Sequence, residues 1–187
     1  MAQHEVMFAG FGGQGIMTAG QLLAYAGIKE GKQVAWIPSY GPEMRGGTAY
    51  CTVVVSDTRI GSPIVTMPRS ICVFNRPSFD KFESKVREHG LLLVNSSLID
   101  VCTTRKDITE LLVPANEMAL RNGNARAANV AVLGALVGMT DIISMDTLRA
   151  TVREKLGRKA DVLEKNMNVL EEGYQLALDR VARKDTV

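Results

Sequence analysis

The sequence predicts an α/β fold: a single Rossmann-like domain over residues 1–187, with a mainly parallel sheet flanked by helices and a helical C-terminal third. Three observations support this prediction. Short apolar runs alternate with amphipathic segments, as they do when helices cover a parallel sheet. A glycine-rich loop joins the first predicted strand to the first predicted helix. The length of 187 residues suits one domain with a substantial buried core.

Six apolar or β-branched runs predict strands, because each is bounded by glycine, proline or polar residues. They are residues 4–9, 33–37, 48–56, 70–74, 91–94 and 110–113. The run at 91–94 is apolar throughout, which is typical of a central strand buried on both faces. Pro63 and Pro68 predict an extended connector over residues 60–68.

Helices are predicted at residues 16–31, 75–90, 114–122, 125–139, 146–156 and 161–183. Asn75 opens the second of these, and Gly90 supplies the glycine expected at its C-terminal end. Residues 125–139 are rich in alanine and glycine, which permits close packing. The last helix is amphipathic, with apolar residues recurring at helical spacing: Leu163, Met167, Leu170, Tyr174 and Leu178.

The loop after the first strand has the spacing G-x-G-x-x-G. Its residues are Gly10, Phe11, Gly12, Gly13, Gln14 and Gly15. Glycine lets the backbone turn sharply and approach a ligand closely, while free N–H groups at a helix start carry the positive end of the helix dipole. The loop therefore predicts binding of a phosphate or another anion. The alternative is that the glycines only allow tight packing of strand against helix.

Two common nucleotide-binding classes are disfavoured. NAD-binding folds usually carry an acidic residue at the end of the second strand, to hold the ribose hydroxyls. Here residues 33–37 run into Pro38, Ser39 and Tyr40 without a carboxylate. A P-loop is excluded because no Gly-Lys-Ser/Thr follows the glycines.

A second loop, residues 39–48, is also chemically dense. Its candidate binding residues are Tyr40, Glu43, Arg45, Gly46 and Gly47. We expect this loop, like the glycine loop, to leave the carboxyl end of a strand, so that both line the crevice where open α/β sheets bind ligands. Arg45 suits a bidentate contact with phosphate or carboxylate, and Glu43 suits holding Arg45 or a partner's backbone. The alternative is an ordered turn that buries Tyr40 and exposes both charges.

No catalytic or metal-binding set emerges from the residues. His4 and His89 are far apart in the sequence, lie in neither loop and lack partners at metal-binding spacing. Cys51, Cys72 and Cys102 form no C-x-x-C pair and are predicted to be buried free thiols. The net charge of +2, with both signs interspersed, favours neither nucleic acid nor membrane as a partner. The start of the chain has no signal-peptide pattern, so the cytoplasm is expected.

Several motifs together resemble the gamma subunit of the 2-oxoacid:ferredoxin oxidoreductases. They are the glycine loop with Gly20, and residues 38–48, 55–57, 60–63, 75–82, 114–116 and 129–136. The resemblance implies a subunit, inactive alone, of an enzyme that converts a 2-oxoacid and coenzyme A to acyl-CoA and reduces ferredoxin. It implies thiamine diphosphate, Mg and [4Fe–4S] clusters on alpha, beta and ferredoxin-like delta subunits, and none of these cofactors on this chain.

For this chain, the resemblance implies that both loops contribute to the coenzyme A site or to subunit docking. The motif Glu43-Met44-Arg45-Gly46-Gly47-Thr48 looks more like the 2-oxoglutarate and branched-chain members than the pyruvate members, so 2-oxoglutarate is favoured. The alternative function is a structural module that braces a neighbouring subunit without touching a cofactor. A free-standing nucleotide-binding oxidoreductase is disfavoured. Residues 60–67 and the last helix are predicted to meet partners, and to cause self-association of the isolated chain.

Overall fold

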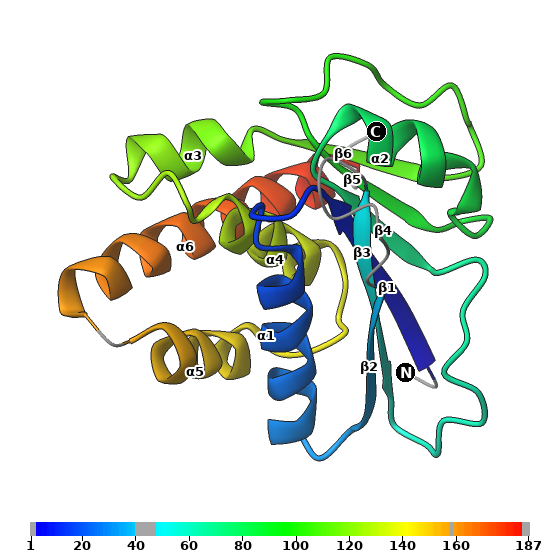
Figure 1. The fold of residues 1–187 in the computed structure, drawn as a ribbon, viewed down its shortest axis with the longest axis horizontal. Coiled ribbons are helices and arrows are strands. Elements are labelled where there is room, and N and C mark those ends of the chain that lie inside the picture. The colour runs from blue at the N-terminus through cyan, green and yellow to red at the C-terminus, as the bar shows by residue number, and fades with distance from the viewer. Residues whose placement is uncertain (1–2, 40–47, 158, 185–187) are drawn as a thin grey trace.

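The computed structural model describes residues 3–39, 48–157 and 159–184 (Figure 1). Along the chain, the elements are β1 (Gln3–Gly10), α1 (Ile16–Lys29), β2 (Gln33–Ser39), β3 (Ala49–Ser56), β4 (Ser70–Val73), α2 (Arg76–Phe82), η2 (Glu83–Lys85), β5 (Leu91–Asn95), β6 (Thr109–Val113), α3 (Ala115–Arg121), α4 (Ala128–Met139), α5 (Met145–Leu156) and α6 (Ala160–Lys184). The predicted order of strands and helices, including the helical C-terminal part, is confirmed.

The described strands form one six-stranded sheet in the order β2-β3-β1-β4-β5-β6. β1, β4, β5 and β6 are parallel, whereas β3 is antiparallel to both of its neighbours. The predicted mainly parallel sheet is therefore confirmed, with one reversed strand among those described. The reversal follows from the short connection between β2 and β3, because a parallel pair needs a crossover of a dozen or more residues.

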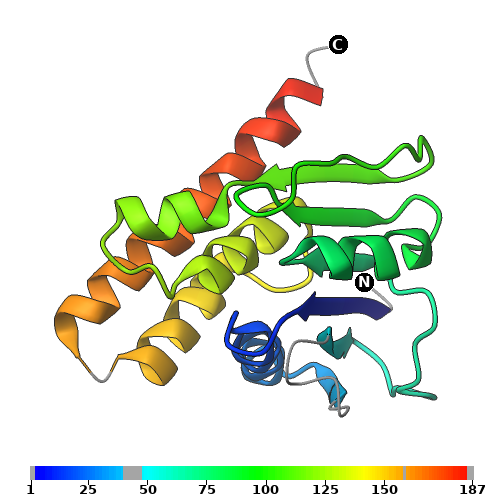
Figure 2. The ribbon, with the colours of Figure 1, turned by 45° about the horizontal axis from the view of Figure 1, so that its top comes forward.

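The two faces of the sheet carry different helices. Val6 and Phe8 of β1 point into the larger apolar cluster, with residues of α1, α4, α5 and α6. Met7 and Ala9 alternate with them and point into a smaller cluster under α2. Figures 1 and 2 show α2 on the opposite side of the sheet from α1 and α4. This arrangement leaves the carboxyl ends of β1, β4 and β5 at one edge, where the glycine loop lies.

Helices α4 and α6 cross with their backbones in contact. An added Cβ on Gly134 would lie 2.2 Å from the carbonyl oxygen of Leu170, and one on Gly173 would lie 2.1 Å from that of Ala131. Much of the apolar stripe predicted on the last helix is thus used inside the chain, since Leu170 is fully buried. The part of this stripe that is left for a partner is smaller than predicted: Leu163, Met167 and Tyr174 are half-buried, and Leu178 is 37% exposed.

The helix predicted over residues 75–90 starts as expected but ends early. Asn75 caps α2, because its side chain accepts a 2.9 Å hydrogen bond from the Ser78 N–H. After one 3-10 turn, η2, the Arg87 N–H donates to the carbonyl of Pro68 instead of continuing the helix. Gly90 consequently lies beyond the helix, and a Cβ there would be 2.6 Å from the Arg69 carbonyl oxygen.

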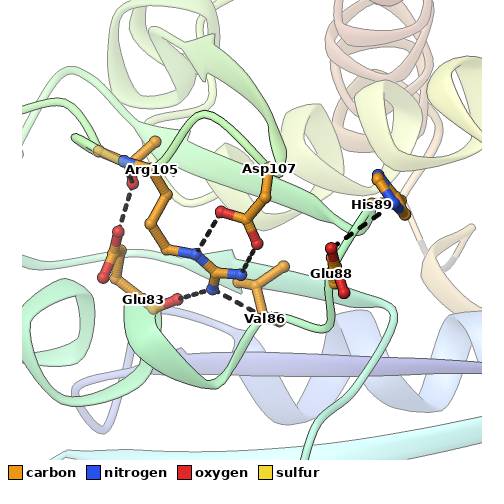
Figure 3. A network of polar contacts seen from close by, with 7 residues as sticks. Glu83, Val86, Glu88, His89, Arg105 and Asp107 are labelled. Carbon is orange, nitrogen blue, oxygen red and sulfur yellow. Dashed lines mark hydrogen bonds and ion pairs between the residues drawn. The ribbon is translucent and has the colours of Figure 1, made fainter.

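Arg105 stabilises this early helix end (Figure 3). Its Nη1 donates to the carbonyl oxygens of Val86 at 2.8 Å and Glu83 at 3.3 Å. Asp107 holds the guanidinium through Nε at 3.0 Å and through a second bond from Nη2. The carbonyls that a longer helix would pair internally are therefore capped by a side chain distant in sequence.

Other differences are smaller. α4 begins at Ala128, because residues 124–127 form a turn closed by the Ala127 N–H on the Asn124 carbonyl. β2 continues to Ser39, which pairs with Tyr50. Cys51 and Cys72 are buried as predicted, but Cys102 is exposed, because it lies in an irregular segment before β6. None of the described helices is both long enough and apolar enough to cross a membrane.

His4 makes stability depend on pH. It is buried near the amino end of β1, with Nε2 2.8 Å from Ser70 Oγ, and burial together with Arg69 lowers its pKa from 6.5 to about 4. The unfolded chain therefore takes up a proton between these pH values while the folded chain does not. Stability from this residue is present above pH 6.5 and is lost as the pH falls toward 4, by about 2–3 kcal/mol.

Urea unfolding of the wild type and His4→Gln at pH 7 and pH 4.5 measures this effect. We expect the wild type to lose about 2–3 kcal/mol more than the variant on acidification. His89→Asn is the matched control, because His89 is exposed and has a positive φ of 59° that asparagine tolerates. Equal pH dependence in the wild type and His4→Gln would contradict the prediction.

Candidate functional site

The glycine loop connects β1 to α1 through two left-handed residues. Gly13 has φ +94° and Gly15 has φ +76°, conformations that glycine adopts without strain. Gly15 is the N-cap residue of α1, and no side chain caps the helix there. The first turn of α1 also contains no acidic residue. The N–H groups at this helix start therefore retain their positive partial charge, which favours an anion.

The predicted site glycines differ in what surrounds them. A Cβ on Gly10 would lie 2.7 Å from Gln14 Oε1, and one on Gly15 would lie 2.7 Å from the Asn129 side chain. Nothing lies within 4 Å of a Cβ on Gly13. Gly10 and Gly15 are therefore required by packing, whereas Gly13 faces open space that a ligand is able to approach.

Gln14 fastens the loop to the next parallel strand. Its Oε1 accepts hydrogen bonds from the Phe11 N–H at 2.7 Å and from Asn75 Nδ2 at 2.9 Å. Its Nε2 donates to the Phe74 carbonyl oxygen at 3.1 Å. These contacts bridge β1 and β4, where the strand order reverses and α/β sheets commonly bind ligands. Because its amide is engaged by the chain itself, Gln14 shapes the site rather than offering free polar atoms.

Asn129, in the first turn of α4, holds the other end of the loop. It is almost fully buried, and its Nδ2 donates to the Gly15 carbonyl oxygen at 3.1 Å. Asn129 lies in one of the sequence motifs, residues 129–136, but the motif alone predicts no role for its side chain. The pattern around it is apolar, so only the tertiary structure shows that an α4 side chain positions the glycine loop.

Two hollows open on either side of Gly13. One, of about 150 Å³, is lined by Gly13, Gln14, Phe74, Asn95, Asn116, Ala125, Arg126 and Ala128. The other, of about 330 Å³, is lined by Gly12, Gly13, Gly15, Ile16, Met17, Thr18 and Ala49. The sequence predicted the glycines in both, but not Asn95, Asn116 or Arg126. For Asn95 the available signal was position, because it directly follows the apolar run 91–94 and is the last residue of β5.

The second predicted loop falls largely outside the described residues. This applies to all of its candidate site residues: Tyr40, Glu43, Arg45, Gly46 and Gly47. The strand ends that flank it are described. Ser39 of β2 pairs with Tyr50, and Gly10 of β1 pairs with the adjacent Ala49. The second loop therefore starts at the same edge of the sheet as the glycine loop, which is the placement that we expected.

The described lining residues offer binding groups rather than acid–base chemistry. Arg126 is the only charged or titratable side chain among the described residues that line the two hollows. Cys51 lies next to the larger hollow, with its Sγ 3.4 Å from the carbonyl oxygen of Ile16, a lining residue. Burial raises the pKa of its thiol to about 12. The thiol is therefore protonated and unreactive at neutral pH. No group of three or more metal-binding side chains gathers among the described residues.

Known proteins resemble this chain over most of its length. The ketoisovalerate oxidoreductase subunit VorA of Methanothermobacter marburgensis is 40% identical over 175 residues, covering 92% of this chain and 36% of VorA. This chain thus spans little more than a third of VorA. The 2-oxoglutarate synthase subunit KorC of Methanocaldococcus jannaschii is 31% identical over 176 residues, covering 92% of this chain and 93% of KorC.

Solved structures share the fold. The gamma subunit of a keto/oxoacid ferredoxin oxidoreductase from Geobacter sulfurreducens has a TM-score of 0.82 at 29% identity, covering 94% of this chain and 99% of that one. A 2-oxoglutarate:ferredoxin oxidoreductase from Magnetococcus marinus, with 2-oxoglutarate, coenzyme A and succinyl-CoA bound, has a TM-score of 0.86. This second match covers 95% of this chain and 31% of that one, at 23% identity, and its likeness is one of fold.

Residues 5–176 match the family described as pyruvate ferredoxin/flavodoxin oxidoreductase. This match covers most of the chain, and the relatives at 40% and 31% identity agree with it. The resemblance to gamma subunits of 2-oxoacid:ferredoxin oxidoreductases is thereby confirmed, and the chain belongs to the pyruvate ferredoxin/flavodoxin oxidoreductase family.

Proposed function

We propose that this chain acts as the gamma subunit of a 2-oxoacid:ferredoxin oxidoreductase, inactive alone, and contributes to the coenzyme A site and to subunit assembly. The observation that carries the proposal is the uncapped junction of the glycine loop and α1. It exposes Gly13 to two hollows, and their described lining contains no acid, base or nucleophile for chemistry of its own. Such a site suits holding the anionic part of a substrate while partner subunits react with it.

Coenzyme A is the proposed ligand because it carries a pyrophosphate and a 3′-phosphate. Backbone N–H groups of the glycine loop suit one of these anions, and Arg45 of the second loop suits another. The coenzyme A bound in the Magnetococcus marinus enzyme, which has the same fold in part of its chain, supports this choice. Thiamine diphosphate, Mg and [4Fe–4S] clusters are proposed for alpha, beta and delta partner subunits, with ferredoxin as electron acceptor in the cytoplasm.

The proposed 2-oxoacid is 2-oxoglutarate or a branched-chain 2-oxoacid. KorC relatives act in 2-oxoglutarate synthases by name, and VorA relatives in ketoisovalerate oxidoreductases. The motif at residues 43–48 of the second loop also favours 2-oxoglutarate and branched-chain 2-oxoacids over pyruvate. Assays of the purified complex with 2-oxoglutarate, ketoisovalerate and pyruvate distinguish them, and a preference for pyruvate would contradict the proposal.

The second candidate is a bracing function, in which the chain supports a neighbouring subunit without touching a cofactor. A specific observation favours it. Both the oxygen and the nitrogen of the Gln14 amide are hydrogen-bonded within the chain, to backbone groups and to Asn75. Gly10 and Gly15 are required by packing. These residues therefore stabilise the loop whether or not it binds a ligand. Gly13 has no such packing contact, and its positive φ is shared by Gly31, so substitutions at these two positions separate the two functions experimentally.

Replacing Gly13 with alanine in the assembled complex is expected to raise the KM for coenzyme A about fivefold, because the methyl group enters the wall shared by both hollows. Gly31→Ala is the matched control. Gly31 also has a positive φ, of 72°, and no atom within 4 Å of an added Cβ, but it follows the opposite end of α1. Each variant is expected to lose about 1–2 kcal/mol of stability from backbone strain.

Steady-state kinetics and urea unfolding of both variants test the proposal. A higher KM for coenzyme A in Gly13→Ala alone, at equal loss of stability, supports a coenzyme A contact. An unchanged KM with impaired assembly of the complex would favour the bracing function instead.

A further inference from the structure

The two edge strands of the sheet differ in how they are protected against further pairing. The β2 edge contains Pro38, which has no backbone N–H to offer to another strand. The β6 edge contains neither proline nor lysine, and its Leu112 is 41% exposed. Its one charged side chain, Glu110, accepts a 2.8 Å hydrogen bond from the Thr103 N–H of the preceding segment. The β6 edge therefore lacks most of the features that keep edge strands from accepting a further strand.

The backbone groups on the outer side of β6 belong to Glu110 and Leu112. The Thr109 N–H and the Val113 carbonyl oxygen each form a 2.9 Å hydrogen bond with a residue that flanks β5. Successive residues of a strand direct their backbone groups to opposite edges. The N–H and carbonyl groups of Glu110 and Leu112 therefore point away from β5, and no described residue forms a hydrogen bond with them.

A groove of about 180 Å³ lies between this edge and the last turns of α6 (Figure 2). Its lining residues come from β6 and α6: Leu111, Leu112, Leu176, Asp179, Arg180 and Arg183. Both arginines are exposed, and neither forms an ion pair with a described residue. The acid in the groove, Asp179, accepts a 2.8 Å hydrogen bond from Gln175 instead. The groove therefore carries a net positive charge beside the open strand edge.

We propose that the β6 edge is a docking surface for an extended acidic segment of a partner chain, which adds to the six-stranded sheet as a further strand. In this mode of binding, main-chain hydrogen bonds give affinity and alternate side chains give specificity. Leu111 faces the α6 side of the sheet, so every second side chain of the added strand meets Arg180 and Arg183 and carries a carboxylate. The side chains between them lie beside Leu112 and are apolar. Resting on the proposed function, the partner chain is another subunit of the complex.

A second copy of this chain fits the edge less well. Two antiparallel copies of β6 in one sheet are related by a two-fold axis perpendicular to the sheet, which places both α6 ends on the same face. Each end carries Arg180 and Arg183 against one aspartate, so the two ends have the same net charge and repel each other. The surface therefore favours a partner of opposite charge.

Hydrogen exchange of single amides, in the isolated chain and in the assembled complex, tests this proposal. We expect the Glu110 and Leu112 amides to exchange about a hundredfold more slowly in the complex, because only there are they hydrogen-bonded. The Leu111 and Val113 amides are internal controls, since they face β5 with or without a partner. This measurement uses the unaltered chain, so it does not depend on the folding of any variant.

Leu112→Pro removes one outward N–H and leaves the bonds to β5 in place, because proline is tolerated on the outer side of an edge strand. It is expected to weaken assembly of the complex at least about tenfold. Leu112→Ala, which keeps the N–H, is the matched control and is expected to weaken assembly less than about threefold. Urea unfolding of both variants checks that each is folded.

Reversing both groove charges, with Arg180→Glu and Arg183→Glu together, is expected to weaken assembly about tenfold, because the carboxylates of the partner lose their counterions. Lys159→Glu and Lys165→Glu together are the matched control. They change the net charge equally but lie at the opposite end of α6, so assembly is expected to stay unchanged.

Equal exchange of the Glu110 and Leu112 amides in the active complex and in the isolated chain would overturn the docking surface and leave the proposed function intact. Slowing that grows with the concentration of the isolated chain would overturn it in favour of a second copy. Should no complex with a thiamine-dependent subunit form, the proposed function fails, and titration of the full chain with a synthetic peptide of alternating valine and aspartate decides the surface. Peptide binding that Leu112→Pro abolishes supports the acidic docking surface, and absence of binding overturns it.

Discussion

Replacing Gly173 with alanine is expected to lower the free energy of unfolding by about 3 kcal/mol. The added Cβ would lie 2.1 Å from the Ala131 carbonyl oxygen and 2.9 Å from its carbon, so α6 and α4 must move apart. Both atoms belong to a helix backbone that is unable to rotate away. The loss is expected although alanine is about 1 kcal/mol better than glycine as a helix former.

Urea unfolding of Gly173→Ala and Gly61→Ala measures this effect. Gly61 has no atom within 4 Å of an added Cβ and no positive φ, so its substitution is expected to change stability by less than about 0.5 kcal/mol. A Gly173→Ala variant as stable as Gly61→Ala would show that the crossing of α4 and α6 tolerates separation.

The fold was predictable where local sequence and tertiary contacts agree. The strand at Leu91–Asn95 is buried on both faces, and Asn75 caps its helix through its own side chain, so local patterns sufficed for both. The end of α2 was not predictable, because Arg105 supplies it from a separate segment (Figure 3). The reversal of β3 depends on the short connection between β2 and β3, and the apolar pattern of the strand itself carries no information on strand direction.

The candidate site was predictable only in its backbone part. Glycine spacing between a strand and a helix has a direct physical meaning, and it identified Gly13. The side chains that complete the site are neutral amides and one arginine: Asn95, Asn116, Asn129 and Arg126. Such residues are common at loops and helix starts, so their type and spacing do not indicate binding. Only the convergence of β4, β5 and α4 at one edge of the sheet brings them together at the candidate site.

Substituting Gln14 by alanine is expected to destabilise the chain by about 2–3 kcal/mol, because three hydrogen bonds are lost at once. The Phe11 N–H and Asn75 Nδ2 would lose their acceptor, and the Phe74 carbonyl would keep only the 3.5 Å contact from Asn95. Thermal or urea unfolding measures the effect. A loss below about 0.5 kcal/mol would show that water replaces the amide without penalty.

Gln14→Glu separates the acceptor and donor roles of this side chain. A glutamate oxygen is able to accept from Phe11 and Asn75 as Oε1 does, but an ionised second oxygen would face the Phe74 carbonyl, and two acceptors repel. Protonation restores a donor toward Phe74, whereas the uncapped start of α1 favours the ionised form by about 0.3–1 kcal/mol. Because the repelled Phe74 carbonyl costs more, about 1–3 kcal/mol, the folded state raises the pKa of the new carboxyl above its unfolded value of about 4.3. Its stability is then closest to wild type below pH 4.3 and falls as the pH rises through the folded pKa.

The difference in unfolding free energy between Gln14→Glu and the wild type, measured at pH 4 and pH 7.5, tests this sign. Both proteins retain His4, so its titration cancels in the difference. We expect the variant to be about 1–3 kcal/mol less stable than the wild type at pH 7.5 and nearly as stable at pH 4. A pH-independent difference would mean that the donor bond to Phe74 contributes nothing, and that the loop is held by the Phe11 and Asn75 bonds alone.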